Sequence, residues 1–241
     1  MLCSETQIEE KEIWQSHFFL LDKGMIIKMK IKILKIVIPV MIMILLISIF
    51  IVAYFFIADI ETDIPKKVEE ECNLEINYFM ERKIFTLSPK NGKKSDLVIL
   101  YFHGGSYVAE ASTQHWEFIE KLAVDTNSTI IVPDYPLAPK YNYKDVFKMV
   151  IPLYKEIIER VDSNNLLLMG DSAGGGLSLA LYEKLSQDNI TLPKKNILIS
   201  PWLDVRLEND KIDDIEKYDN ELNRKNLKLA GIAYASDDRN G

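Results

Sequence analysis

Downstream of residue 63, the hydrophobic positions of the chain follow two alternating patterns. Short apolar or β-branched runs of four to six residues are typical of buried strands. Apolar positions spaced three and four apart predict helices with one core-facing side. The expected strands are Leu74–Phe79, Lys83–Leu87, Leu97–Phe102, Thr129–Val132, Leu166–Met169 and Asn196–Ile199. The expected helices are Ser112–Thr126, Tyr143–Val161 with a kink at Pro152, Gly175–Leu185 and, more weakly patterned, Leu222–Tyr234.

Strands that alternate with helices of this length predict an α/β fold. The sheet should be mostly parallel and covered by helices on both faces, because parallel strands need a crossover connection. In such sheets, functional residues gather at the carboxyl ends of the strands. Two glycine-rich motifs, after Phe102 and after Met169, fall at such ends. The acid-rich stretch Glu208–Glu216 is expected to be a solvated surface.

A third pattern, found nearer the N-terminus, predicts a membrane anchor. The 23 residues from Ile36 to Ala58 contain no charge. As a helix they would span about 34 Å, which is enough for a bilayer core. Since lysines mark the cytoplasmic side, the flanking charges predict a single-pass orientation with the N-terminus in the cytoplasm. The lysines that precede the segment are Lys23, Lys28, Lys30, Lys32 and Lys35, and the acids that follow it are Asp59, Glu61 and Asp63.

The domain organisation follows from this anchor. We expect a cytoplasmic tail over residues 1–35, a transmembrane helix over 36–58 and an extracytoplasmic catalytic-type domain over 64–241. A cleaved signal peptide is the alternative. Its apolar region would span about 7–15 residues and end at a small-x-small cleavage site. The apolar run here is longer and Ala58-Asp59 is a poor site, so the pattern favours an uncleaved anchor.

Composition removes several other classes of function. The net charge of −7 offers no basic surface for nucleic acid. The two cysteines, Cys3 and Cys72, lie far apart and form neither a metal-binding spacing nor a disulfide framework. The cysteines therefore predict no metal site.

The motif after Met169 predicts a nucleophilic serine. The sequence Gly170-Asp171-Ser172-Ala173-Gly174 follows an apolar run and precedes a small-residue helix. A serine nucleophile on a sharp strand-to-helix turn needs glycines around it, because a Cβ there would clash. The alternative is that Ser172 only caps a helix, but a cap does not need these glycines.

The motif after Phe102 predicts an oxyanion hole. In His103-Gly104-Gly105-Ser106 the glycines leave backbone N–H groups unobstructed. We expect the amides of Gly105 and Ser106 to act together with the amide of Ala173, which follows the nucleophile. Taken alone, this segment could also be an ordinary glycine turn.

Four motifs in order resemble the hormone-sensitive-lipase-type esterases of the α/β-hydrolase superfamily. They are Tyr101-Phe102-His103-Gly104-Gly105-Ser106-Tyr107, Asp134-Tyr135-Pro136-Leu137-Ala138-Pro139, Gly170-Asp171-Ser172-Ala173-Gly174-Gly175 and Ser200-Pro201-Trp202-Leu203-Asp204. The resemblance implies a carboxylic ester hydrolase that acts on small or medium acyl esters without a cofactor; amide or peptide hydrolysis would use the same parts. It also implies that His103 shapes the oxyanion loop and is not the catalytic base. Ser106 stands where the family usually has a third glycine. Prolines fix the course of the Asp134–Pro139 loop, which is expected to brace the oxyanion segment.

The sequence departs from the family at the catalytic base. The superfamily orders its triad as Ser, then Asp or Glu, then His. The three histidines, His17, His103 and His115, all precede Ser172, and His115 is expected to face solvent or pack locally. We therefore expect a hydrolase domain truncated at its C-terminus, with triad acid and base absent and little activity. The alternative is a non-catalytic remnant or binding module.

Overall fold

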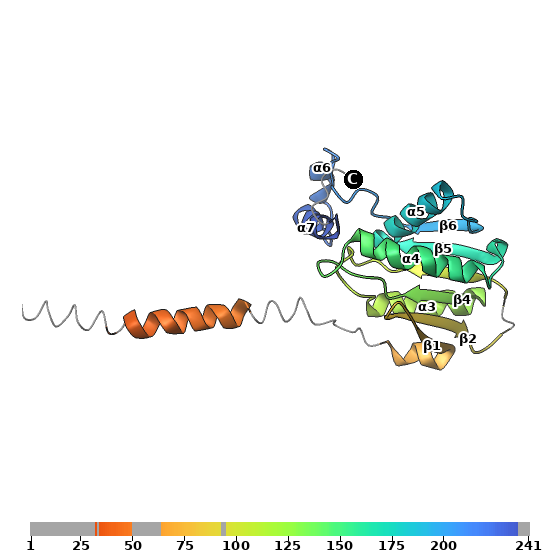
Figure 1. Ribbon diagram of the computed structural model, residues 1–241, viewed down its shortest axis with the longest axis horizontal. Coiled ribbons are helices and arrows are strands. Elements are labelled where there is room, and N and C mark those ends of the chain that lie inside the picture. Colours follow the sequence, from red (N-terminus) through yellow and green to blue (C-terminus); the bar gives the residue numbers. More distant parts are fainter. Residues whose placement is uncertain (1–31, 33, 50–63, 93–94, 236–241) are drawn as a thin grey trace, which may run out of the picture. The chain divides into compact units, whose positions relative to one another are not determined.

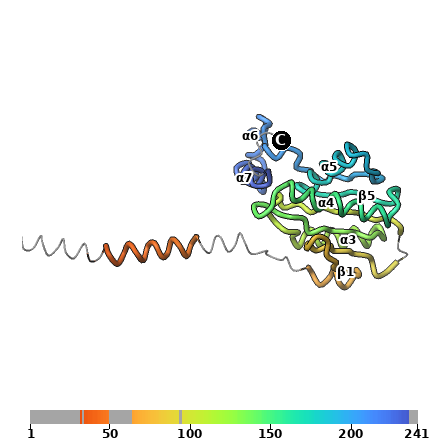
Figure 2. The backbone as a smooth tube through the Cα atoms, viewed as in Figure 1, coloured from red at the N-terminus to blue at the C-terminus, as the bar shows by residue number. Residues whose placement is uncertain are grey.

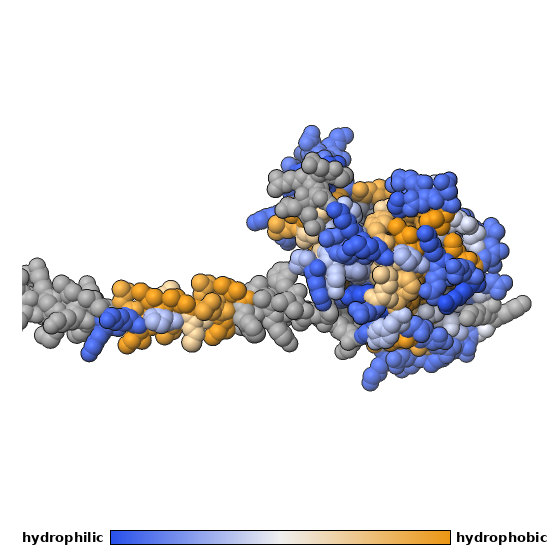
Figure 3. Space-filling view, in the orientation of Figure 1, coloured by the Kyte–Doolittle hydropathy of each residue, from blue (hydrophilic) through white to orange (hydrophobic). Residues whose placement is uncertain are grey.

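The computed structural model describes residues 32, 34–49, 64–92 and 95–235, and the chain divides into two compact units, residues 1–59 and 60–241. In the first unit, residues 34–49 form one helix (Figure 1). The face of this helix that Figure 3 shows is mainly hydrophobic, and side chains such as Ile36 and Met41 are 67% and 65% exposed. This helix has no polar stripe of the kind that a surface helix of a water-soluble domain presents.

The predicted tail falls largely outside the described residues, and the predicted anchor falls partly outside them. Of the anchor, residues 36–49 are described and residues 50–58 are not; of the tail, residues 1–31 and 33 are not. Within the described ranges, none of the helices combines the length and the apolar character needed to cross a membrane.

In the described part of the second unit, six strands form one mixed sheet (Figure 1). The order across the sheet is β1-β2-β4-β3-β5-β6. Strand β2 pairs antiparallel with β1 and β4, whereas β3 with β4, β3 with β5, and β5 with β6 pair in parallel. The predicted mostly parallel α/β sheet is thereby confirmed. The bounds are β1 Cys72–Phe79, β2 Arg82–Pro89, β3 Val98–Phe102, β4 Thr129–Pro133, β5 Leu166–Asp171 and β6 Lys195–Ile199.

Strand β3 is buried on both faces. Leu100 and Phe102 pack into one hydrophobic cluster, and Ile99 and Tyr101 pack into another. Successive side chains of a strand point to opposite faces, so two clusters lie on opposite sides of the sheet. A strand in this position has no water-facing side, which explains its uninterrupted apolar sequence.

Helices cover both faces of the sheet. Helices α4 (Tyr143–Ile158) and α5 (Ser172–Gln187) contribute side chains to the cluster that contains Leu100. Helices α2 (Lys66–Glu71) and α3 (Thr113–Thr126) contribute to the cluster that contains Ile99. The result is a three-layer arrangement that fixes the carboxyl ends of β3 and β5 side by side.

Two helix boundaries differ by three residues from the sequence prediction. Helix α4 ends at Ile158 instead of Val161, runs through Pro152 as one element, and is followed by the short 3-10 helix η1 (Ser163–Asn165). Helix α5 begins at Ser172, three residues before the predicted Gly175. The second difference matters for function, because it makes the candidate nucleophile the first residue of the helix.

Two helices follow the sheet, and the second of them packs against loops that follow the strands. After edge strand β6 come α6 (Ile212–Glu216) and α7 (Arg224–Ala235), drawn in blue at the end of the trace in Figure 2. Helix α7 packs tightly on the loop after β6, since a Cβ on Gly231 would lie 2.2 Å from the carbonyl oxygen of Val205. Its Tyr234 stacks on Tyr107, with ring centroids 3.8 Å apart. Helix α7 therefore lies beside the loops that follow β3 and β6.

Candidate active site

Ser172 lies on a strained turn between β5 and α5. Its φ of +48° is in the left-handed region, which costs a residue with a side chain about 1–2 kcal/mol. A Cβ on Gly170 would lie 2.3 Å from the carbonyl oxygen of Gly174, and one on Gly174 would lie 2.0 Å from that of Phe102. Both glycines are therefore required by the close approach of the backbone, as the spacing of the motif predicts.

The loop after β3 bends sharply and keeps two amides open. Gly105, Ser106 and Tyr107 all have positive φ, at +108°, +56° and +62°. The amides of Val108 and Ala109 donate back to the carbonyl oxygen of Gly105, at 3.0 Å each. Within the residues that the structure describes, the amides of Gly105 and Ser106 donate to no protein acceptor. Amides without a partner are the donors that an oxyanion hole needs.

The loop and the turn are in contact. A Cβ built on Gly104 would lie 3.2 Å from the Cβ of Ser172. Ala173, the second residue of α5, belongs to the first turn, whose amides have no acceptor inside the helix. The structure thus places the loop that contains Gly105 and Ser106 against the turn that contains Ser172 and Ala173.

The Asp171 carboxylate links this turn to two other elements. Its Oδ1 accepts from the Tyr101 hydroxyl at 2.6 Å and from the Gly104 amide at 2.9 Å. Its Oδ2 lies 3.2 Å from Nε2 of His115. Burial opposes ionisation of this carboxyl, but the hydrogen bonds from His115 and Tyr101 outweigh it and hold the pKa of Asp171 below its ordinary value. Asp171 is therefore an ionised group that holds the oxyanion loop by its first glycine amide.

His103 supports the loop from the other side. It is 1% exposed, its Nδ1 donates to the carbonyl oxygen of Gly104 at 2.6 Å, and its ring stacks on Tyr135 with centroids 4.6 Å apart. Burial lowers the pKa of His103 to about 4, so the ring is neutral near pH 7. A buried, neutral and hydrogen-bonded ring fits the expected structural role of His103.

The Asp134–Pro139 loop braces this histidine, as the sequence analysis predicts. The Tyr135 hydroxyl donates to the carbonyl oxygen of His103 at 2.8 Å. Arg82 on β2 in turn holds Asp134, with its Nε on the main-chain oxygen and its Nη2 on the carboxylate, each at 2.8 Å. The antiparallel hairpin therefore supports the oxyanion loop through two layers of contacts.

His115 has a role that local sequence reasoning missed. The expectation of local packing is correct only for its Nδ1, which accepts from the Ser112 amide at 2.9 Å in a capping box at the start of α3. Its Nε2 reaches Asp171, 56 residues later in the sequence. The serine three residues before it is a recognisable cap signal, but no spacing in the sequence points to the distant carboxylate.

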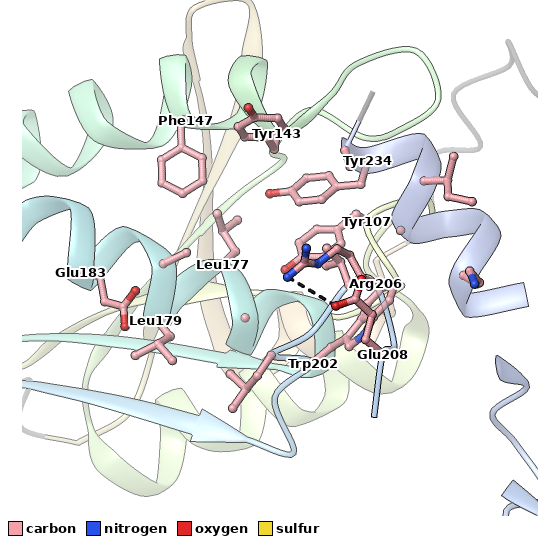
Figure 4. Close-up of a pocket in the computed structure, with 18 residues that line it drawn as sticks. Tyr107, Tyr143, Phe147, Leu177, Leu179, Glu183, Trp202, Arg206, Glu208 and Tyr234 are labelled. Atoms are coloured by element: carbon pink, nitrogen blue, oxygen red, sulfur yellow. Dashed lines mark ion pairs between the residues drawn. The ribbon is translucent and has the colours of Figure 1, made fainter. Parts of the chain in front are cut away.

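A cavity opens next to the turn. It has a volume of about 860 Å³ and is lined mainly by α4, α5, α7 and the loop after β6. Figure 4 shows Tyr107 and Tyr234 face to face at its wall, with Phe147 and Tyr143 on the α4 side. Ser172 is not among the lining residues, but the Trp202 amide, which belongs to the cavity wall, donates to the Ser172 carbonyl oxygen at 2.7 Å.

No metal-binding arrangement accompanies the site in the part of the chain that the structure describes, where no group of three or more His, Cys, Asp or Glu side chains could hold an ion. The polar groups that the structure gathers at this point are a hydroxyl, backbone amides and a partly buried carboxylate.

Comparison with protein families shows which family the chain belongs to. Residues 99–240 match the model of the alpha/beta hydrolase fold. The chain belongs to this family. A curated relative, an esterase of Acinetobacter venetianus, is 30% identical over 142 residues, which cover 58% of this chain and 47% of the relative. The chain thus spans about half the length of that curated member of the alpha/beta hydrolase fold family.

Solved structures of the family show the same architecture. A Staphylococcus aureus protein described as a candidate esterase superposes with a TM-score of 0.68 at 28% identity, covering 73% of this chain and 60% of the other. An esterase of the bacterial hormone-sensitive lipase family superposes with a TM-score of 0.65 at 22% identity, covering 74% of this chain and 58% of the other. At that lower identity the second comparison shows the fold alone.

Replacing Gly174 by Ala is expected to destabilise the fold strongly. The new Cβ would lie 2.0 Å and 2.4 Å from the carbonyl oxygens of Phe102 and His103, and backbone can move only at a cost of about 3 kcal/mol or more. Gly175→Ala is the matched control, because its nearest contacts are at 3.0 Å and Ala favours the helix by about 1 kcal/mol. Urea unfolding should show a much larger loss for Gly174→Ala; similar midpoints for both variants would contradict the close packing.

Folding stability is expected to depend on pH through His103. Its pKa is about 4 in the folded chain and about 6.5 in the unfolded chain, so the unfolded chain binds more protons between these values. The free energy of unfolding should therefore fall as pH decreases from about 6.5 to 4, by at most about 1.4 kcal/mol per pH unit. Urea titrations of the full chain test this, with His103→Gln expected to remove this part of the slope. An unchanged slope in the variant would show that His103 does not titrate in this way.

Proposed function

We propose that this chain is a membrane-anchored serine hydrolase of carboxylic esters, with Ser172 as nucleophile and the amides of Gly105, Ser106 and Ala173 as oxyanion hole. The observation that supports it most directly is the strained turn at Ser172, which lies in contact with the oxyanion loop. Strain of this kind persists only where the surroundings enforce it, and it is typical of functional turns.

The proposed reaction is acyl transfer in two steps. The Ser172 hydroxyl oxygen bonds to the ester carbonyl carbon while a base takes its proton, and the carbonyl oxygen becomes an oxyanion held by the three amides. Collapse of this intermediate breaks the bond to the alcohol, which leaves with a proton, and gives an acyl-serine. Water then attacks the same carbon, the bond from that carbon to the Ser172 oxygen breaks, and a proton from the water returns to this oxygen as the carboxylic acid leaves. Each oxyanion donor is worth about 3–4 kcal/mol of the barrier.

The catalytic base is not found among these 241 residues at the position where the family usually has it, after the nucleophile. No histidine follows Ser172 in the sequence. Of the two described histidines, His103 is buried with a pKa of about 4, and His115 has both ring nitrogens in contact with other groups. We therefore propose that the 241-residue polypeptide turns over slowly, since loss of the base costs about a million-fold in a serine hydrolase.

A non-catalytic binding role is the second candidate. The lack of a histidine after Ser172 favours it as well. In this case the fold, the oxyanion loop and the cavity would serve to hold a ligand without cleaving it. Whether Ser172 is chemically activated separates the two candidates.

The proposed substrates are small or medium acyl esters. The relative from Acinetobacter venetianus is named an esterase. The cavity of about 860 Å³, with its aromatic walls at Tyr107, Trp202 and Tyr234, has the size and apolar lining of a small-molecule site. Its position beside the turn would put an apolar group of the ester next to the nucleophile.

A fluorophosphonate probe is expected to label Ser172 in the full chain. The open amides stabilise the developing phosphoryl charge even without a dedicated base, so labelling should be slow but specific to this serine. Peptide mass spectrometry locates the adduct, and Ser172→Ala should abolish it. Hydrolysis of p-nitrophenyl acetate should stay far below ordinary enzyme rates. Absent labelling of a folded chain would favour the binding role, whereas rapid ester turnover would contradict the proposed lack of a base.

The anchoring part of the proposal concerns residues 36–58, with the N-terminus in the cytoplasm and the hydrolase unit outside it. The uncharged run and the apolar surface of the helix over residues 34–49 support it. Replacing Leu45 and Ile47 by Arg should release the chain from membranes into the supernatant, because each Arg costs about 2.5–3.5 kcal/mol at the centre of a membrane helix. Leu203→Arg, at a 63% exposed position of the hydrolase unit, is the control and should leave fractionation unchanged. Alkaline extraction of membranes that releases the unmodified chain would argue against an anchor.

A further inference from the structure

The Asp171 side chain occupies a helix cap position but does not cap the helix. It is the N-cap residue of α5, and no hydrogen bond joins its side chain to the first turn. An aspartate at this position ordinarily accepts from the amide of the second or third helical residue. Here those residues are Ala173 and Gly174. A cap on the first of these two amides would occupy the donor that the proposed reaction needs for the oxyanion.

Three donors hold the carboxylate elsewhere. The Tyr101 hydroxyl and the Gly104 amide bind Oδ1, at 2.6 Å and 2.9 Å, and Nε2 of His115 faces Oδ2 at 3.2 Å. The side chains of Asp171 and His115 are only 23% and 18% exposed, so water competes weakly for these bonds. Both oxygens of the carboxylate are thus bound by groups from β3, the oxyanion loop and α3.

We propose that His115 and Tyr101 are positioning residues that keep the Asp171 carboxylate away from the first turn of α5. As a result, the Ala173 amide has no side-chain acceptor, and the Gly104 amide stays hydrogen-bonded to Asp171. The inference rests on the proposed function, because an open Ala173 amide matters only for an oxyanion. The two residues act through Asp171 and need not touch a substrate.

The contacts of His115 define its tautomer. The Ser112 amide can only donate, so Nδ1 of His115 must accept, and the ring proton is on Nε2, facing Asp171. One ring thereby satisfies the helix cap of α3 and donates to the carboxylate at the same time. Two amide-bearing replacements separate these tasks. His115→Asn can place an oxygen at the position of Nδ1 but is too short to reach Asp171, whereas His115→Gln can extend an amide N–H toward it.

Selective labelling makes the two critical amides observable in the full chain. The sequence contains one His-Gly pair, His103-Gly104, and one Ser-Ala pair, Ser172-Ala173. Carbonyl ¹³C on His or Ser combined with ¹⁵N on Gly or Ala therefore gives a single assigned amide signal in each sample. Hydrogen exchange of these signals can be followed in detergent micelles of the full chain, without any activity.

In His115→Asn, the exchange rates of the two amides are expected to change in opposite directions. Exchange of the Gly104 amide should be about 10-fold faster or more, because a bond to a charged acceptor is weakened. Exchange of the Ala173 amide should be slower by about 3-fold or more, because the released carboxylate can cap α5. The rate of fluorophosphonate labelling of Ser172 should fall about 10-fold as the Ala173 donor is lost. His115→Gln should stay within about 3-fold of the unmodified chain on all three measurements.

Tyr101→Phe is the second test, because it removes only the hydroxyl that binds Oδ1 and keeps the ring against Phe118. It should change the hydrogen-exchange rates of the Gly104 and Ala173 amides in the same directions as His115→Asn does. A merely structural role would instead speed the exchange of both amides together. Faster exchange of both amides would overturn the proposal. Unchanged exchange in folded His115→Asn, or equal effects of the Asn and Gln replacements, would also overturn it.

Failure of the proposed function is distinguishable. If Ser172 of the unmodified chain takes up no probe while the two amides shift in opposite directions, the positioning of Asp171 stands and the hydrolase assignment fails. If labelling occurs but the amides do not respond, the positioning proposal alone is wrong.

Discussion

The hydrogen bonds of the Asp171 carboxylate are the constraint on which the rest of the site depends. They join three segments that are far apart in the sequence: the end of β3 with its loop, the start of α3, and the turn before α5. Because the charged group is largely withdrawn from water, each donor that binds it stabilises the ionised form, and each is held in place in return. The short distance between Gly104 and Ser172 follows from this shared carboxylate.

Backbone strain in the site is balanced by support from outside it. Ser106, Tyr107 and Ser172 all adopt positive φ although none is glycine. Such conformations persist only when their surroundings leave no alternative. The Tyr135 hydroxyl on the His103 carbonyl, and Arg82 on Asp134 behind it, supply that support from the antiparallel side of the sheet. The β1–β2 hairpin therefore contributes to the candidate site without contributing a reactive group.

Local patterns were sufficient to predict the elements and the two glycine motifs, because both are properties of neighbouring residues. The buried run before Phe102 and the glycines around Ser172 indicate strands and close backbone approach directly from side-chain size. The start of α5 at Ser172 was missed, since consecutive small residues give no hydrophobic periodicity. The Asp171–His115 contact was missed for another reason. It depends on how α3 is placed against the end of β5, and tertiary packing of this kind leaves no trace in the spacing of residues.

The histidines show how position decides chemistry for one residue type. Burial keeps His103 neutral, and a main-chain acceptor holds its proton on Nδ1. A main-chain donor keeps the proton of His115 on Nε2. Their rings lie 5.9 Å apart, yet His103 is only 1% exposed and His115 has both ring nitrogens in contact with other groups. Proximity of a histidine to a serine is therefore not sufficient for a catalytic pair. The two rings instead hold their neighbours in place. His103 binds the oxyanion loop, and His115 binds the Asp171 carboxylate that orients this loop.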